Sequence, residues 1–272
     1  MAALLNWDYQ GINPEKPGLG KREIKGIELK PSRPPPPTLS RFIGVHPPLT
    51  SFFDANRSTR PPGFGKLPPV KQSIVTLDME GVLTPEIWIA VAEKTGIPEL
   101  RRTTRDEPDY DQLMRYRISI LDQHGIKLSD IQNVIGTLPL LDGARAFLDD
   151  LRAVTQVIIL SDTFEQFALP LIRQLNWPSL FCHKLVVVDD RITDYKLRVP
   201  DQKKKAVTAL KSLNYRVVAA GDSFNDTAML IEADAGFLFH APPNVIAQFP
   251  QFQAVNTYAE LSSLIKAALD TP

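Results

Sequence analysis

The sequence has one cysteine, no net charge and no long apolar run, and each absence excludes a class of protein. With Cys182 alone, an internal disulfide and a cysteine-based zinc site are excluded. No apolar run reaches the roughly 18 residues that a membrane-spanning helix needs. Lys and Arg number 31 and Asp and Glu also 31, so charge gives no reason to expect nucleic acid. We therefore expect a cytoplasmic protein that binds neither membrane nor nucleic acid.

Proline and charge divide the chain near residue 70. Residues 1–70 hold 13 of the 24 prolines, including the run Pro34–Pro37, and 10 Lys and Arg against 5 Asp and Glu. Proline cannot donate to a sheet ladder, and the residue before it disfavours helix. We expect 1–70 to be a disordered, Pro-rich tail.

The tail leaves several interpretations open. A polyproline II helix at Arg33–Pro37 would fit an aromatic groove of a partner, but a solvated leader without a partner is the simpler interpretation. A transit peptide is poorly supported, because the segment contains acidic residues and lacks an amphipathic stripe. A start of translation downstream of Met1 is a further alternative.

After residue 71 the pattern is typical of a folded domain. Amphipathic stretches at 143–154 and 201–213 predict helices, and we expect Asp142 to cap the first. A hairpin is expected over 183–197. Short apolar runs, typical of strands buried on both faces, occur at 73–77, 156–160, 216–220 and 235–239. Alternating strands and helices predict an α/β fold with a doubly wound, mostly parallel sheet.

One long interval, between the first two strands, breaks the alternation. It carries helical patterns at 86–94, 110–123 and 129–135. An insertion directly after the first strand would lie over the carboxyl edge of the sheet, where open α/β sheets bind ligands. We therefore expect a helical cap at 87–137 that acts as a lid on a catalytic core made of 71–86 and 138–272.

Oxygen-bearing side chains follow three of the predicted strands: Asp78, Glu80, Ser161, Asp162, Asp222 and Asp226. Parallel strands share one carboxyl edge, so these groups should converge. Clustered carboxylates repel one another and are stable with a bound cation or with raised pKa values. Oxygen ligands favour a hard cation, with Mg²⁺ first.

Lys203 lies in the first turn of the predicted helix 201–213, where the helix dipole favours anions. A lysine there makes sense beside a bound anion. Ser161, with backbone N–H groups following it, is a suitable donor to phosphate. Lys204 is the alternative for the phosphate-binding lysine.

These residues fall in four ordered motifs: DMEGVLT at 78–84, LSDT at 160–163, Lys203, and GDSFND at 221–226. The set resembles the haloacid dehalogenase (HAD) superfamily of phosphatases, and within it the phosphoserine phosphatases. PEIWIA at 85–90 and AEKTGI at 92–97 are similar to the ThrH type, which combines phosphoserine phosphatase with homoserine phosphotransferase. The similarity extends over about residues 72–265.

The resemblance implies a HAD-like core and a Mg²⁺-dependent phosphoric monoester hydrolase in serine and threonine metabolism. Asp78 would attack phosphorus and form an aspartyl-phosphate. Glu80, where the superfamily more commonly has Asp and the ThrH type shares Glu, would be the general acid and then the base. The metal would be held by Asp78, the main-chain carbonyl of Glu80, Asp222 and Asp226.

The resemblance also assigns a pocket for phosphoserine, with homoserine as a phosphoryl acceptor. Glu86 would meet the substrate ammonium group and Arg117 the carboxylate. Ser161 and Lys203 would hold the phosphoryl group, and Asp162, by its main-chain N–H, and Asn225 would line the same pocket. A homodimer is left open.

Two other functions stay open at this point. One is a HAD phosphatase for another small phosphate ester. The other is a scaffold with an idle phosphatase domain, recruited through the Pro-rich tail, although the intact Asp78, Lys203 and Asp222 argue against it. Cys182 and its neighbour His183 have no third catalytic partner in the sequence, so we expect Cys182 to be structural.

Overall fold

The computed structural model describes residues 71–270 except 105 and 108. The expectations for the tail at 1–70, including a partner for it, therefore lie outside the described residues. Within these limits, strands form one sheet in the order β4-β3-β2-β1-β5-β6-β7. Their bounds are β1 Gln72–Leu77, β2 Gln156–Phe164, β3 Ser179–Val188, β4 Arg191–Lys196, β5 Tyr215–Gly221, β6 Ala235–Phe239 and β7 Gln253–Val255.

All neighbouring strands in this sheet pair in parallel except β3 and β4, which form the predicted antiparallel hairpin. The hairpin turns at Asp189 and Asp190, whose φ angles of 47° and 64° lie in the left-handed region that Asp tolerates. The doubly wound, mostly parallel sheet expected from the sequence is thereby confirmed.

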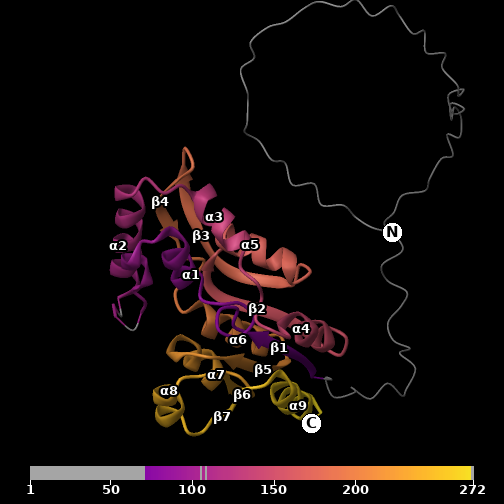
Figure 1. The fold of residues 1–272 in the computed structure, drawn as a ribbon. Helices are drawn as coiled ribbons and strands as arrows, with labels where there is room; N and C mark the ends of the chain where they lie inside the picture. The colour runs from indigo at the N-terminus through magenta and orange to yellow at the C-terminus, as the bar shows by residue number, and fades with distance from the viewer. Residues whose placement is uncertain (1–70, 105, 108, 271–272) are drawn as a thin grey trace, which may run out of the picture. The chain divides into compact units, whose positions relative to one another are not determined.

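Helices cover both faces of the sheet (Figure 1). In β5, Val217 and Ala219 pack with α6 and α7, whereas Val218 and Ala220 belong to the larger core that contains α4, α5 and α9. Burial on both faces explains why the central strands carry continuous apolar runs. The helices are α1 Ile87–Thr95, α2 Tyr110–Gln123, α3 Leu128–Gly136, α4 Ala144–Arg152, α5 Glu165–Gln174, α6 Gln202–Ser212, α7 Thr227–Glu232, α8 Pro243–Gln248 and α9 Tyr258–Leu269, with 3₁₀ turns η1 Pro98–Arg101 and η2 Phe224–Asp226.

Helices α1, α2 and α3 fill the interval between β1 and α4, each within one residue of its expected bounds. They pack beside the hairpin (Figure 1): Arg115 of α2 lies 3.4 Å from Asp194 of β4, and the Leu128 N–H donates to the Asp190 carbonyl at 2.8 Å. The helical insertion is therefore tied to the sheet through the β3–β4 hairpin.

The prediction that Asp142 caps α4 is wrong. Gly143, with φ 83°, holds the cap position, and no side chain caps the helix. The sequence interpretation also missed β7, α5, α7, α8 and α9 and ended β2 at residue 160, whereas the strand continues to Phe164.

In that part of the chain described by the structure, no helix combines the length and the apolar character needed to cross a bilayer.

The C-terminal helix α9 allows a test of the fold that leaves the site untouched. The Thr257 hydroxyl caps it by accepting from the Glu260 N–H at 3.3 Å, and Glu260 Oε2 accepts in turn from the Thr257 N–H at 3.1 Å. Thr257→Ala should lower the free energy of unfolding by about 1 kcal/mol. In the control Ser263→Ala, a mid-helix hydroxyl bonded to the Ala259 carbonyl is removed, and stability should stay unchanged or rise. Chemical denaturation measures both, and an equal loss in the two variants would contradict the cap.

Candidate active site

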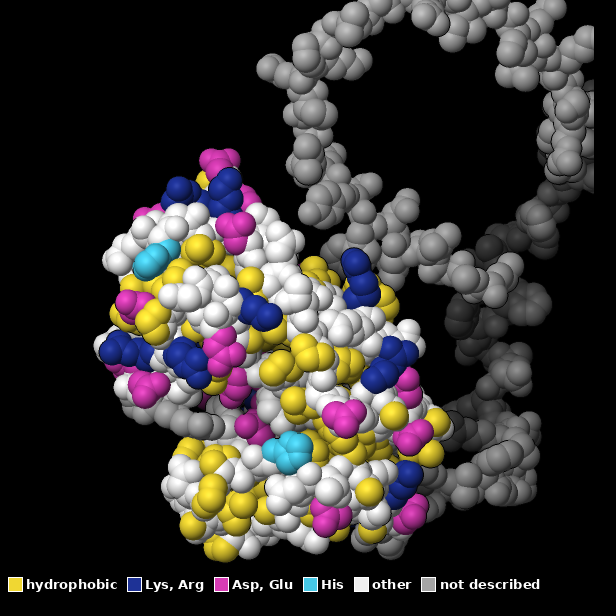
Figure 2. Space-filling model, in the orientation of Figure 1, with side chains coloured by type: hydrophobic (Ala, Val, Ile, Leu, Met, Phe, Trp, Pro, Cys, Tyr) yellow, Lys and Arg dark blue, Asp and Glu magenta, His cyan; other side chains and the backbone are white. Residues whose placement is uncertain are grey.

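A cleft of about 390 Å³ opens where β1, β2 and β5 end. Figure 2 shows Asp and Glu side chains gathered at a hollow on this face of the described surface. Of the ten predicted site residues, nine line the cleft: Asp78, Glu80, Glu86, Arg117, Ser161, Asp162, Lys203, Asp222 and Asn225. The tenth, Asp226, is fully buried. The convergence expected from the parallel sheet is therefore present.

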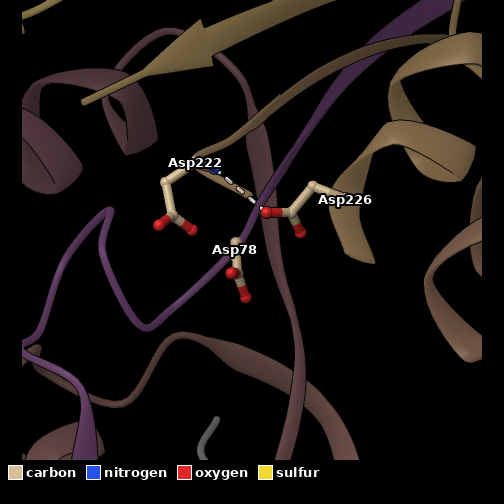
Figure 3. A group of neighbouring side chains, drawn as sticks. All are labelled: Asp78, Asp222 and Asp226. Carbon is tan, nitrogen blue, oxygen red and sulfur yellow. Dashed lines mark hydrogen bonds between the residues drawn. The ribbon is translucent and has the colours of Figure 1, made fainter. Parts of the chain in front are cut away.

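Three aspartates form the floor of the site (Figure 3). Asp78, Asp222 and Asp226 each offer a carboxylate oxygen, and these oxygens lie within 4.8 Å of one another. Asp78 continues β1, because its N–H donates to the Ala220 carbonyl at 3.0 Å, and its Oδ1 accepts from the Met79 N–H at 2.7 Å. Closely spaced oxygens of this kind are the ligands that a hard divalent cation takes.

Asp226 differs from the other two because both its oxygens are occupied. Oδ2 accepts from the N–H groups of Asp222 and Ser223 at 3.0 and 3.1 Å, and Oδ1 accepts from Lys203 Nζ at 2.7 Å. Asp226 thus organises the loop after β5. Burial, and then the charge of Asp226, raise the pKa of Asp222 to about 7. Burial also raises the pKa of Asp78, with Asp226 adding to the shift and Lys203 opposing it.

Lys203 is the charged centre of the site. It is 4% exposed, and its Nζ lies 2.7 Å from Asp226 Oδ1, 2.9 Å from Asp78 Oδ1 and 3.6 Å from Asp162 Oδ2. Burial alone would lower the pKa of Lys203, but the carboxylates of Asp226 and Asp78 outweigh it and hold the pKa above its usual value. Lys204 is exposed and does not line the cleft.

Glu80 lies at the cleft wall, two residues beyond Asp78. Its Oε2 accepts from the Ile87 N–H at 2.9 Å, at the start of α1. Burial, and next the charge of Glu86, raise the pKa of Glu80 to about 7. A carboxyl group with this pKa can both donate and accept a proton near neutral pH. Glu86 itself is exposed at the rim, at the N-cap position of α1.

Arg117 comes from α2 on the opposite side of the cleft and is 5% exposed. Its Nη2 donates to the Arg102 carbonyl at 2.7 Å, and its guanidinium lies over the Trp88 ring at 4.5 Å. Burial lowers the pKa of Arg117 to about 10, so the group stays charged at neutral pH. Its buried Nε has no hydrogen-bond partner among the described residues, and the Arg117 side chain lines the cleft, where a guanidinium group suits an anionic ligand.

The segment after the middle of β2 carries Ser161 and Asp162. Ser161 is buried, and its Oγ accepts from the Thr163 N–H at 3.2 Å. Asp162 Oδ2 accepts from Asn225 Nδ2 at 3.1 Å, which links this segment to the loop after β5. The predicted residues of the two motifs are therefore in direct contact.

Sequence reasoning missed three residues that contact Asp162. The Gln202 side chain donates to the Ser161 carbonyl and to Asp162 Oδ1, the Tyr110 hydroxyl donates to the Asp162 carbonyl at 3.1 Å, and His183 Nε2 lies 3.6 Å from Asp162 Oδ1. Gln202 could have been found from its place next to Lys203. Tyr110 and His183 come from distant segments, and the sequence carries no signal for their approach.

Comparisons with known proteins agree with this geometry. A family model described as haloacid dehalogenase-like hydrolase matches residues 72–234. Phosphoserine phosphatase ThrH of Pseudomonas aeruginosa is 63% identical over 189 residues, covering 69% of this chain and 92% of that protein. A phosphoserine phosphatase of Pseudomonas syringae pv. tomato is 61% identical over 197 residues, covering 72% of this chain and 83% of that protein.

Solved structures share the fold. The crystal structure of phosphoserine phosphatase from T. onnurineus in complex with NDSB-201 has a TM-score of 0.57 at 21% identity, covering 74% of this chain and 98% of that one. A structure described as a phospho-aspartyl intermediate analogue of phosphoserine phosphatase has a TM-score of 0.60 at 18% identity, covering 72% and 99%.

The turn after Asp78 allows a test of the acidic floor. Gly81 has φ +77°, and a Cβ there would lie 2.5 Å from the Asp222 carboxyl group. Gly81→Ala should therefore displace Asp222 and lower kcat at least about tenfold, because moving a reacting or ligating group by about 1 Å is costly. Gly125→Ala is the matched control, with φ +65° and no atom within 4 Å of the added Cβ. Both substitutions put a side chain on a left-handed backbone conformation and should lower stability, and Gly81→Ala should lower it more because of the added clash. Equal kcat values would contradict the tight approach.

Proposed function

The chain belongs to the haloacid dehalogenase-like hydrolases and, within them, to the phosphoserine phosphatase family. From this premise we propose that it hydrolyses phosphoserine through an aspartyl-phosphate formed on Asp78. One observation carries the proposal: a single cleft is lined by Asp78, by the buried Lys203 that contacts it, and by the buried guanidinium group of Arg117. Asp78 and Lys203 suit the phosphoryl group, and Arg117 suits the carboxylate of an amino acid.

The acidic floor supports Mg²⁺ as the cofactor, because the three clustered aspartates offer only oxygen ligands. Asp78, Asp222 and the main-chain carbonyl of Glu80 would hold the ion, and Asp226, already bonded to Lys203, would support the site. When bound, the ion offsets the repulsion between the carboxylates and the substrate and polarises the phosphoryl oxygens.

Asp78 is the nucleophile in this proposal. Among the described residues, its hydrogen bond and ion pair go to Oδ1, which leaves Oδ2 to attack. The bond from Oδ2 to phosphorus forms as the bond from phosphorus to the serine oxygen breaks. Glu80 donates its proton to the departing oxygen. It then takes a proton from water as the water attacks phosphorus, the bond from Oδ2 to phosphorus breaks, and phosphate leaves with the Asp78 carboxylate restored. Lys203 and Ser161 hold the phosphoryl oxygens as charge spreads over them.

The amino-acid end of the substrate lies toward the helical insertion. Glu86 would meet the ammonium group at the rim, and Arg117 the carboxylate. We propose that residues 87–137 form a cap over a core of 71–86 and 138–272, because α2 brings Arg117 into the cleft from outside the sheet. A cap that carries the carboxylate-binding arginine would select amino-acid phosphates over other esters.

Transfer to homoserine follows from the same chemistry if an acceptor hydroxyl takes the place of water in the second step. This activity, a cytoplasmic location and a homodimer stay predictions. Phosphoserine as the substrate, rather than another small phosphate ester, is also a prediction, and the following assay tests it.

The proposal is tested by phosphate release from phosphoserine, phosphothreonine and p-nitrophenyl phosphate. Phosphoserine should have the highest kcat/KM, and EDTA should abolish turnover until Mg²⁺ is restored. Asp78→Asn should lower kcat about 10⁴-fold or more, as loss of a nucleophile does. Homoserine should divert part of the product to phosphohomoserine. Turnover of the other esters without phosphoserine turnover would contradict the proposed substrate.

The pKa of Glu80 gives a second test. Because that pKa is raised to about 7, Glu80 should lose the proton that it donates as the pH rises through 7, and kcat for phosphoserine should fall on the alkaline side. Glu80→Gln should lower kcat by about 10²–10⁴-fold, with little change in KM, and remove this dependence. Glu86→Gln should instead raise KM, and it should move the alkaline fall to lower pH without removing it, because the charge of Glu86 helps to raise the pKa of Glu80. A Glu80→Gln enzyme with the wild-type profile would remove Glu80 from the proton transfers.

A further inference from the structure

The Asp162 carboxylate places a negative charge beside the proposed phosphoryl site, and the mechanism above gives that charge no step. Its Oδ2 lies 3.6 Å from Lys203 Nζ, just beyond hydrogen-bond length. Lys203 already bonds Asp226 and Asp78 at 2.7 and 2.9 Å. An ammonium group has three N–H donors, so one donor is left for a phosphoryl oxygen. If Asp162 moved closer, it would compete with the substrate for that donor.

Three side chains hold the Asp162 carboxylate at its present distance. Asn225 Nδ2 donates to Oδ2 at 3.1 Å, and Gln202 Nε2 donates to Oδ1 at 3.2 Å. His183 Nε2 faces the same Oδ1 at 3.6 Å. The Asp162 carboxylate is therefore held from two sides, with Lys203 and Asn225 toward Oδ2 and Gln202 and His183 toward Oδ1.

The hydrogen bonding of His183 decides which of its nitrogens carries the proton. Nδ1 accepts from the Arg198 N–H at 3.1 Å, so Nδ1 has no proton and the neutral ring carries it on Nε2. The side chain is 4% exposed and packs beside the rings of Tyr110 and Phe164, which restrict its rotation. His183 therefore presents a fixed N–H dipole to the Asp162 carboxylate.

We propose that His183 is a positioning residue for the phosphate site. Its Nε2–H holds the Asp162 carboxylate away from Lys203 and so keeps one lysine donor free for the phosphoryl group. The 3.6 Å contact is electrostatic, and a small shift of the segment around Asp162 would turn it into a hydrogen bond. This inference rests on the proposed function for the identity of the anion, a phosphoryl group, but concerns a residue outside the proposed reaction.

Two substitutions at residue 183 separate the two contacts of the ring. In His183→Asn, the side-chain oxygen can take the place of Nδ1 and accept from Arg198, but the amide does not reach Asp162. In His183→Gln, the longer side chain places an N–H donor near the position of Nε2. If His183 has only a structural role, His183→Asn should bind orthophosphate as well as His183→Gln or better. The proposed role predicts tighter binding by His183→Gln.

The measurement is orthophosphate binding to the full chain in the presence of Mg²⁺, by calorimetry, together with KM and kcat for p-nitrophenyl phosphate. His183→Asn should weaken orthophosphate binding about tenfold, the effect of one lost hydrogen bond, and raise KM by a similar factor. His183→Gln should keep most of the affinity. His124→Gln, at an exposed position at the end of α2, is the control and should match the wild type.

A double-mutant cycle with Asp162→Asn identifies the route of the effect. Removal of the competing charge should keep or tighten orthophosphate binding, and His183→Asn should have no further effect on binding in that background. If His183→Asn does not fold, His183→Gln and Asp162→Asn still test the proposal. Any of four results would overturn the proposal. Orthophosphate binding could be weakened equally in the two His183 variants, or the weakening by His183→Asn could persist in the Asp162→Asn background. Asp162→Asn alone could weaken orthophosphate binding, or the wild type could fail to bind orthophosphate. Because binding is measured directly, failure to hydrolyse phosphoserine refutes the proposed function without deciding this inference.

Discussion

The contact between the Lys203 ammonium and the carboxylates of Asp78 and Asp226 is the interaction on which the site depends. All three groups are at most 5% exposed at their side chains, and a buried charge without a partner is strongly destabilising. Lys203 supplies one positive charge against the carboxylates of Asp78 and Asp226, and the pKa values of Asp222 and Glu80 are raised, so ionisation of all four carboxyl groups leaves an excess of negative charge. That excess is what makes a divalent cation a fitting occupant.

The fold brings these charges together through three features of the chain. Parallel pairing of β1 with β2 and β5 places three strand ends at one edge. Gly221 allows the loop after β5 to fold back, since a Cβ there would lie 2.4 Å from the Asp226 side chain. Helix α6 starts directly at the cleft, so Gln202 and Lys203 enter the site from its first turn. Asp78 and Lys203 thus lie at the ends of a strand and a helix, and the helical insertion would supply the amino-acid specificity proposed for Arg117.

Much of this arrangement could be predicted from the sequence, for identifiable reasons. The central strands are buried on both faces, so their apolar runs stand out, and parallel pairing then forces Asp78, Ser161 and Asp222 to one edge. The preference for Lys203 over Lys204 comes from the family resemblance and not from the run of three lysines itself, because the choice depends on the helix register that buries the first and exposes the second.

Other features could not be predicted because they depend on tertiary packing. His183 and Tyr110 reach Asp162 only because the β3–β4 hairpin and α2 pack against the end of β2. The prediction of Asp142 as a helix cap was wrong because Gly143, in a left-handed conformation, turns the chain into α4 one residue later. Strand β7 has three residues, too few to stand out as a pattern.

The central claim is that a phosphoryl group is carried on the side chain of Asp78 during turnover. Rapid quenching of the enzyme with phosphoserine and Mg²⁺, followed by borohydride reduction and peptide mass spectrometry, tests it directly, because reduction converts an aspartyl-phosphate to homoserine at the modified position. The account predicts conversion at residue 78 and at no other aspartate. Conversion at a different residue, or none under conditions of rapid turnover, would contradict it.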